Sequence, residues 1–224
     1  MSIQKSEIQL KVNDQTTKNA YLASPKDGGP GILVLHAWWG LKPFFKQVCD
    51  QLAERGFVAL APDLYQGKVA TTIPEAEAYH TEFEQNGSEL MSGTVKAAQN
   101  YLSSHCTGQP IGVMGFSMGA AWSMIVAADE PNVSTVVLFY GVYVPNFKQM
   151  TAKVLGHFAE VDEWEPLDGI KAAEKDLHAA GVDVTFHVYP KVGHWFVESD
   201  RPEYDSAAAS VAWERTFEFL KKNI

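Results

Sequence analysis

Basic residues are scarce in this sequence. Among its 224 residues, 18 are lysine or arginine and 27 are aspartate or glutamate, which gives a formal net charge of −9. Nucleic acids and anionic membranes bind basic surfaces, so neither is an expected partner. The sequence also lacks an apolar run of about 18 residues, the length of a membrane-spanning helix. Its first residues lack an apolar stretch followed by a small-residue cleavage site, so we expect no signal peptide.

Cysteine is almost absent as well. Cys49 and Cys106 are the only two, and no group of His, Asp or Cys residues has the spacing of metal ligands. We therefore expect reduced, buried thiols and no metal site. Together with the missing signal peptide, this predicts a cytoplasmic protein.

Apolar runs alternate with helix-like segments from residue 31 to the end. Residues 31–36, 57–61 and 111–116 are continuous apolar runs, which are typical of strands buried on both faces of a parallel sheet. The segments between them carry apolar residues at helical spacing. This alternation predicts one α/β domain over residues 1–224, with a mostly parallel central sheet and helices on both faces.

The most informative motif is Gly115-Phe116-Ser117-Met118-Gly119, a G-x-S-x-G sequence between an apolar strand-like run and a small-residue helix-like run. In that context the serine lies on a sharp strand-to-helix turn, and its hydroxyl is held above the sheet. The N–H of Met118 then lies at a helix start, where it can stabilise an oxyanion. The alternative is a glycine-flanked turn whose serine only caps the helix.

A serine nucleophile needs a histidine base and an orienting carboxylate. In the nucleophile-turn arrangement these follow in the order Ser, acid, His, and the sequence offers Asp162 and then His194, each just after a predicted strand. Glu160 and Glu163 are rivals of Asp162, and this acidic run can also be solvated surface. For the second oxyanion donor we expect the N–H of Trp38, with Ala37 and Trp39 as neighbouring alternatives.

Several segments, taken together, resemble the dienelactone hydrolase family, a branch of the α/β-hydrolase superfamily. They are HAWWGL, APDLYQG, GFSMGAA, FYG, Asp162 four residues before Pro166, and GHWF. The resemblance covers residue 31 to the C-terminus. It implies an α/β-hydrolase fold without a large cap domain, no cofactor, and hydrolysis of a small-molecule ester or lactone. It also implies Ser117, Asp162 and His194 as the catalytic triad.

The sequence departs from the family pattern at the nucleophile, at a glutamate position and at the substrate-binding arginines. Dienelactone hydrolases carry a cysteine nucleophile, where this chain has Ser117, and a glutamate at the position of Ala37. A serine has no resting thiolate to control, so the two changes are consistent. The family's substrate-binding arginines are also missing around residues 75–76 and at Glu198, and Arg201 is out of register. A charged dienelactone is therefore not the expected substrate, because arginines would bind its carboxylate in a bidentate manner.

Aromatic residues are expected to line the substrate pocket, which suits a neutral, apolar ester. They are Trp38, Trp39, Phe44, Tyr140, Tyr143, Trp164 and Trp195. The alternative for each is simple core packing. The sequence thus predicts a serine carboxylesterase or lactonase that works through an acyl-enzyme, as a monomer or small homo-oligomer. A thioesterase or acyltransferase with the same triad, and a catalytically silent binding protein of the same fold, remain alternatives.

Overall fold

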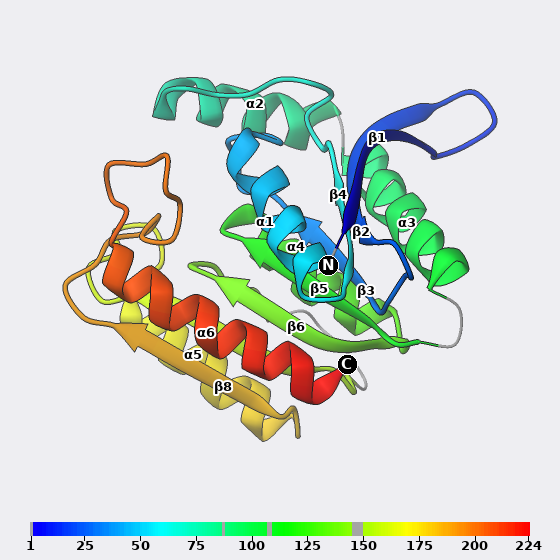
Figure 1. The fold of residues 1–224 in the computed structure, drawn as a ribbon. Coiled ribbons are helices and arrows are strands. Elements are labelled where there is room, and N and C mark those ends of the chain that lie inside the picture. The colour runs from blue at the N-terminus through cyan, green and yellow to red at the C-terminus, as the bar shows by residue number, and fades with distance from the viewer. Residues whose placement is uncertain (1, 87, 107–108, 145–149) are drawn as a thin grey trace. The chain divides into compact units, whose positions relative to one another are not determined.

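Strands and helices largely alternate along the chain, as the sequence predicted (Figure 1). The computed structural model describes residues 2–86, 88–106, 109–144 and 150–224. The chain divides into two units, residues 1–111 and 112–224. The expectation of one domain over residues 1–224 stays a prediction. Among the described residues, no helix is both long enough and apolar enough to cross a membrane.

The first unit begins with a hairpin and continues with strands and helices in turn. Its described elements are β1 (Ile3–Lys11), β2 (Thr17–Pro25), β3 (Gly31–Leu35), α1 (Pro43–Glu54), β4 (Val58–Pro62), α2 (Ile73–Asn86) and α3 (Ser88–His105). The strands lie in the order β1-β2-β4-β3. The pairs β1–β2 and β2–β4 are antiparallel, whereas β3 and β4 are parallel.

Helices cover both faces of β3 and β4. Every residue of these two strands is buried, and successive side chains of a strand point to opposite faces. Helix α1 packs on one face with Phe45, Val48, Cys49 and Leu52, which recur at helical spacing and are all buried. Helix α3 packs on the other face, close enough that a Cβ on Gly31 would lie 3.3 Å from Leu102 Cδ2. The continuous apolar runs in the sequence are therefore explained by burial on both sides.

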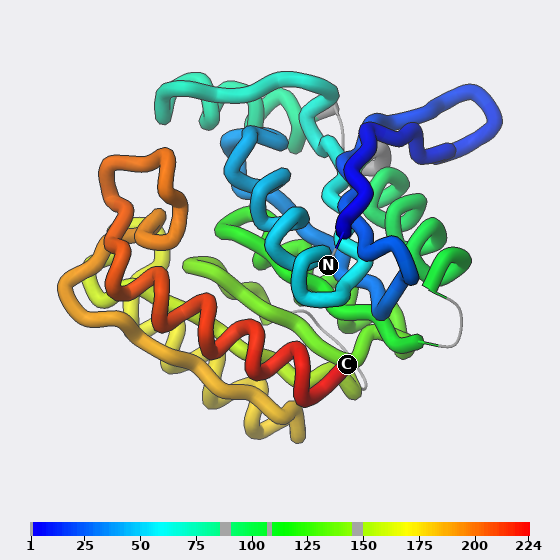
Figure 2. The backbone as a smooth tube through the Cα atoms, viewed as in Figure 1, coloured from blue at the N-terminus to red at the C-terminus, as the bar shows by residue number. Residues whose placement is uncertain are grey.

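The second unit is a sheet with parallel pairing and three helices in its described part. Its elements are β5 (Ile111–Phe116, which starts at the unit boundary), α4 (Met118–Asp129), β6 (Val133–Phe139), β7 (Lys153–Ala159), α5 (Leu167–Ala179), β8 (Val184–Tyr189) and α6 (Ser206–Asn223). The strand order is β5-β6-β7-β8, and β6–β7 and β7–β8 are parallel pairs. Helices α5 and α6 lie on opposite faces of this sheet, as the tube in Figure 2 shows.

This parallel sheet brings distant parts of the sequence to one edge. The carboxyl ends of neighbouring parallel strands lie together, and ligands of open α/β sheets bind there. Ser117 follows β5, Asp162 follows β7, and His194 follows β8. No described segment is left outside the two units to form a separate cap domain.

Candidate active site

Ser117 lies on a strained turn between β5 and α4. Its backbone has φ 50° and ψ −113°, a left-handed conformation that non-glycine residues rarely adopt. Gly115 permits this turn, because a Cβ there would lie 2.1 Å from the backbone oxygen of Gly119. The G-x-S-x-G motif thus has the strand–turn–helix context that the sequence predicted.

The end of β6 supports the same turn from the side. The N–H of Ser117 donates to the carbonyl of Phe139 at 2.9 Å. Gly141 lies so close that a Cβ on it would be 2.6 Å from the Ser117 carbonyl oxygen. The backbone of Ser117 is therefore held by a hydrogen bond to Phe139 and by close packing against Gly141, where a residue larger than glycine would not fit.

His194 lies between the serine and a carboxylate. Its Nε2 is 2.9 Å from Ser117 Oγ, and its Nδ1 is 2.7 Å from Asp162 Oδ2. The carboxylate accepts a hydrogen bond from Nδ1–H, so Nε2 is the nitrogen that accepts a hydrogen bond from the serine hydroxyl. The His194 side chain is 5% exposed and that of Asp162 is fully buried. A buried imidazole in this tautomer can take a proton from the serine.

The two oxygens of Asp162 have separate partners. While Oδ2 contacts His194, Oδ1 accepts from the N–H groups of Trp164 at 2.9 Å and Glu165 at 3.0 Å. Of the rival carboxylates, Glu160 accepts instead from the N–H of Lys191 at 2.9 Å, and Glu163 is exposed. The structure therefore brings Asp162, rather than its rivals, to the imidazole.

Sequence reasoning missed a second carboxyl beside this group. Glu165 Oε1 accepts from the N–H of Val142 at 3.0 Å. Burial raises the pKa of this carboxyl, while the Val142 hydrogen bond and the proximity of His194 act in the opposite direction. Its membership in the acidic run 160–165 was the only signal in the sequence, and that run does not show which carboxylates become buried.

Tyr140, one of the predicted pocket aromatics, packs against His194 and pairs with a buried glutamate that sequence reasoning missed. The hydroxyl of Tyr140 donates to Glu198 Oε1 at 2.6 Å, and the ring lies 4.9 Å from the imidazole. Both residues are fully buried, and Tyr140 has a φ of 39°. Burial, followed by the charge of Glu198, raises the pKa of Tyr140, so the phenol stays protonated. The available signal in the sequence was Glu198 itself, an acidic residue that directly follows the apolar residues Trp195, Phe196 and Val197.

The predicted oxyanion donors lie in different units. Met118 is the first residue of α4, where the helix terminus favours negative charge. Trp38 lies in the first unit, in the segment that follows β3. Its part in an oxyanion hole stays a prediction.

Of the predicted pocket aromatics, two in the second unit contact the imidazole. Besides Tyr140, the ring of Trp195 lies 5.1 Å from His194, and Trp164 lies 6.2 Å from Trp195. Trp164 and Tyr143 are 45% and 49% exposed. Trp39 and Phe44 are buried in the first unit. Whether any of these aromatics binds substrate stays a prediction.

Arg201 is placed beside this aromatic group. Its guanidinium carbon lies 4.7 Å from the centre of the Trp195 ring, and its nitrogens lie 3.3 and 3.4 Å from the carboxylate of Glu203. Within the described residues, no group of three or more His, Cys, Asp and Glu side chains is arranged to hold a metal ion.

Known proteins resemble this chain over nearly its whole length. The model of the dienelactone hydrolase family matches residues 19–224. A protein of Aquifex pyrophilus named Protein usf is 35% identical over 90% of this chain and 92% of its own. A candidate carboxymethylenebutenolidase of Aquifex aeolicus is 33% identical over 90% of this chain and 91% of its own. The crystal structure of a candidate dienelactone hydrolase from Klebsiella pneumoniae has a TM-score of 0.82 and 25% identity, covering 99% of both chains.

These similarities confirm the predicted fold and the family resemblance. The chain has the α/β-hydrolase fold of the dienelactone hydrolases, with a mostly parallel sheet and helices. It belongs to the dienelactone hydrolase family, whose members are hydrolases of the ester and lactone type.

Proposed function

We propose that the protein is a serine hydrolase that cleaves neutral carboxylic esters or lactones through an acyl-enzyme. The observation that carries this proposal is the pair of contacts made by His194, 2.9 Å to Ser117 Oγ and 2.7 Å to Asp162 Oδ2. A hydroxyl, an imidazole and a carboxylate in this series form the arrangement that activates a serine.

In the first half of the reaction, Ser117 Oγ attacks the carbonyl carbon and His194 Nε2 takes the hydroxyl proton. The Asp162 carboxylate stabilises the imidazolium that forms. The N–H of Met118 donates to the developing oxyanion. As the tetrahedral intermediate collapses, the C–O bond to the alcohol breaks. The departing oxygen takes the proton from His194, and the acyl group stays on Ser117.

In the second half, water replaces the alcohol. His194 Nε2 takes a proton from the water as its oxygen attacks the acyl carbon. Collapse of this second intermediate returns the proton to Ser117 Oγ and releases the carboxylic acid. With a lactone, the alcohol and the acid are two ends of one product.

A neutral substrate is favoured by the surroundings of the imidazole. Tyr140 and Trp195 present aromatic surface next to His194, which suits apolar acyl or aryl groups. The nearby cation, Arg201, lies close to the Glu203 carboxylate, which offsets its charge. A substrate carboxylate would therefore find less attraction here than beside uncompensated arginines.

The test is covalent labelling of Ser117 combined with a substrate panel. An organophosphorus probe should label the folded wild type at Ser117, and intact mass should rise by one adduct. Ser117→Ala should take no label and lose about 10³-fold or more of its turnover of p-nitrophenyl esters, the scale seen when a triad member is removed.

Ser206→Ala is the matched control. Ser206 is exposed at the start of α6, so labelling and turnover should equal those of the wild type. Lactones and thioesters complete the panel. Faster turnover of thioesters than of oxyesters would contradict the carboxylesterase assignment, and a folded wild type that is neither labelled nor active would contradict the serine mechanism altogether.

A further inference from the structure

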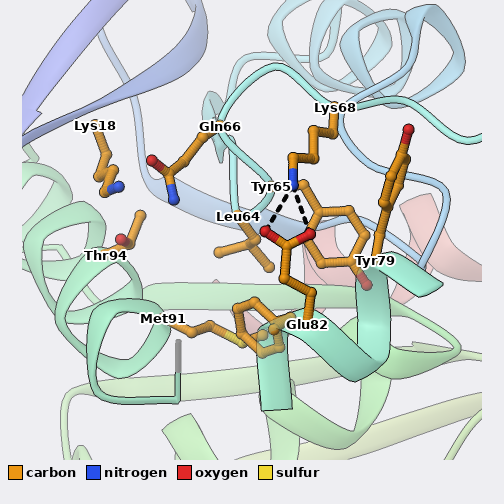
Figure 3. Close-up of a pocket in the computed structure, with 10 residues that line it drawn as sticks. Lys18, Leu64, Tyr65, Gln66, Lys68, Tyr79, Glu82, Met91 and Thr94 are labelled. Carbon is orange, nitrogen blue, oxygen red and sulfur yellow. Dashed lines mark hydrogen bonds and ion pairs between the residues drawn. The ribbon is translucent and has the colours of Figure 1, made fainter. Parts of the chain in front are cut away.

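The first unit contains a cavity that none of the triad residues lines. Its volume is about 330 Å³, at the lower end of the range for small-molecule sites. Figure 3 shows Lys18, Gln66 and Thr94 gathered at one end, with Tyr65, Tyr79 and an ion pair at the other. We propose that this cavity binds a small organic monoanion, a carboxylate attached to an aromatic or other apolar body.

Lys18 is the residue that points to an anion. It lies on β2, two residues before Ala20, which is fully buried. Residues two apart share a face of a strand, so a lysine occupies a position where apolar residues are the rule. Lys18 is only 9% exposed, and among the described residues its ammonium has no ion-pair partner. A largely buried cation without a carboxylate partner is costly unless something else satisfies it.

The other cation of the cavity is already neutralised. Lys68 Nζ lies 2.7 and 2.6 Å from the two carboxylate oxygens of Glu82. It also lies 5.4 Å from the centre of the Tyr79 ring. The lining therefore carries one uncompensated positive charge, at the Lys18 end, which matches a ligand with one negative charge.

At the opposite end of the cavity, aromatic and apolar side chains surround the Lys68–Glu82 ion pair. The Tyr65 ring lies 6.3 Å from Tyr79 and 5.7 Å from Phe83, and Leu64 and Met91 complete the lining. Aromatic rings at these separations offer faces and edges to a flat or branched apolar group. A ligand that reaches from this end to Lys18 must combine an apolar body with an anionic head.

The wall that carries Leu64, Tyr65 and Gln66 is held in place by hydrogen bonds. The Asp63 carboxylate accepts from the N–H groups of Tyr65 at 3.1 Å and Gly67 at 2.6 Å. The N–H of Leu64 donates to the buried His36 Nε2 at 3.1 Å. A wall fixed in this way loses little conformational entropy when a ligand binds.

A phosphate group fits less well than a carboxylate. It would bring a charge of about −1.5 to −2 at neutral pH, against one uncompensated ammonium and with the Glu82 carboxylate in the same cavity. A carboxylate also accepts from the hydroxyl and amide donors that Thr94 and Gln66 carry at the Lys18 end.

Calorimetric titration of the full chain tests this proposal. The probe is 3-phenylpropionate, titrated into the Ser117→Ala protein so that hydrolysis plays no part. We expect one-to-one binding that Lys18→Met weakens about 10- to 100-fold, the equivalent of one lost charge-assisted hydrogen bond. Lys26→Met, the same change at an exposed lysine, should leave the affinity unchanged. The neutral 3-phenylpropanol and inorganic phosphate should both bind at least about tenfold more weakly than the probe.

Further measurements separate the cavity from the hydrolytic site. Protein labelled at Ser117 by the organophosphorus probe should bind 3-phenylpropionate as before, and Tyr79→Ala should weaken binding without removing Lys18. The proposal is overturned if wild type and Lys18→Met bind equally, if labelling abolishes binding, or if phosphate binds better than the probe. These outcomes leave the hydrolase proposal untouched, because none of them measures turnover.

Discussion

Asp162 is the residue whose role the geometry defines most narrowly. One oxygen accepts a hydrogen bond from His194 Nδ1–H, and the other accepts hydrogen bonds from two backbone N–H groups. In Asp162→Asn, an amide nitrogen turned toward Nδ1 would favour the wrong tautomer of the imidazole. We expect kcat for p-nitrophenyl esters to fall about 10³- to 10⁴-fold while the variant still folds. Steady-state kinetics and a thermal unfolding curve measure the two effects.

The neighbouring carboxylates provide the controls for this variant. Glu163→Gln changes an exposed side chain and should keep wild-type kcat. Glu165→Gln keeps an acceptor for the Val142 N–H and should lower kcat far less than Asp162→Asn. A loss in Glu165→Gln equal to that of Asp162→Asn would contradict the assignment of Asp162 as the orienting acid.

At the residue scale, the sequence predicted the candidate catalytic residues, because the nucleophile-turn arrangement requires them in a fixed order along the chain. Ser117, Asp162 and His194 follow the Ser–acid–His order, and the structure brings them together. The sequence did not predict Glu198 or Lys18, because a charged residue in a strand or loop normally predicts exposure. Their burial comes from tertiary contacts between segments far apart in the chain, such as the 58-residue separation between Tyr140 and Glu198.

At the scale of elements, the close contact between the segment after β6 and the turn at Ser117 can be tested by enlarging Gly141. In Gly141→Ala, the new Cβ would lie 2.6 Å from Ser117 O and 2.9 Å from Ser117 Cα. The turn must move, and overpacking of this kind costs about 1–3 kcal/mol. We expect lower stability in denaturant titration and at least about a tenfold loss of kcat, since displacement of a catalytic group by 1 Å can cost about 10²-fold.

Gly169→Ala is the matched glycine variant. Gly169 lies in α5, and a Cβ there would meet no atom within 4 Å. Replacing glycine by alanine in a helix stabilises by roughly 0.5–1 kcal/mol. This variant should therefore be more stable than the wild type with unchanged kcat. Equal behaviour of the two glycine variants would show that the close approach of Gly141 to Ser117 has no consequence.

The sequence predicted the elements with strong patterns and was less accurate where the pattern is weak. Continuous apolar runs predicted β3, β4 and β5 within one or two residues, because burial on both faces leaves few alternatives. The edge hairpin was placed too narrowly. The alternation of apolar and polar residues from Ile8 to Val12 predicts a strand there, whereas β1 begins at Ile3. The segment from Asn19 to Ala23 predicts its partner strand, whereas β2 begins at Thr17. Strands with one solvated face carry polar residues that also suit loops.

At the scale of the whole molecule, buried titratable groups limit the pH range of stability. Burial lowers the pKa values of His36, His157 and His187 below the ordinary 6.5. It raises those of the two cysteines above 9.0 and that of Tyr140 above 10.0. Below about pH 6.5 the unfolded chain binds more protons than the native one, and above about pH 9 it binds fewer. Thermal midpoints should therefore be highest between about pH 6.5 and 9 and fall on either side.

His157 gives the acid side of this prediction a specific test. Its Nδ1 lies 2.8 Å from the Tyr189 hydroxyl and its Nε2 lies 2.9 Å from Thr216 Oγ1. Arg215 donates a hydrogen bond to the same Tyr189 oxygen at 3.2 Å. Burial, then the proximity of His187 and Arg215, lowers the pKa of His157. The native imidazole stays neutral, while that of the unfolded chain takes a proton near pH 6.5.

Replacing this histidine should reduce the dependence of stability on pH. Each unit by which the native pKa is lowered corresponds to about 1.4 kcal/mol lost once the pH falls below it. His157→Gln keeps groups that can bond Tyr189 and Thr216 but cannot be protonated, so its thermal midpoint should fall less between pH 7 and 5.5 than that of the wild type. His178→Gln, an exposed position on α5, should keep the wild-type slope. Equal slopes in wild type and His157→Gln would mean that burial of this imidazole does not contribute to acid unfolding.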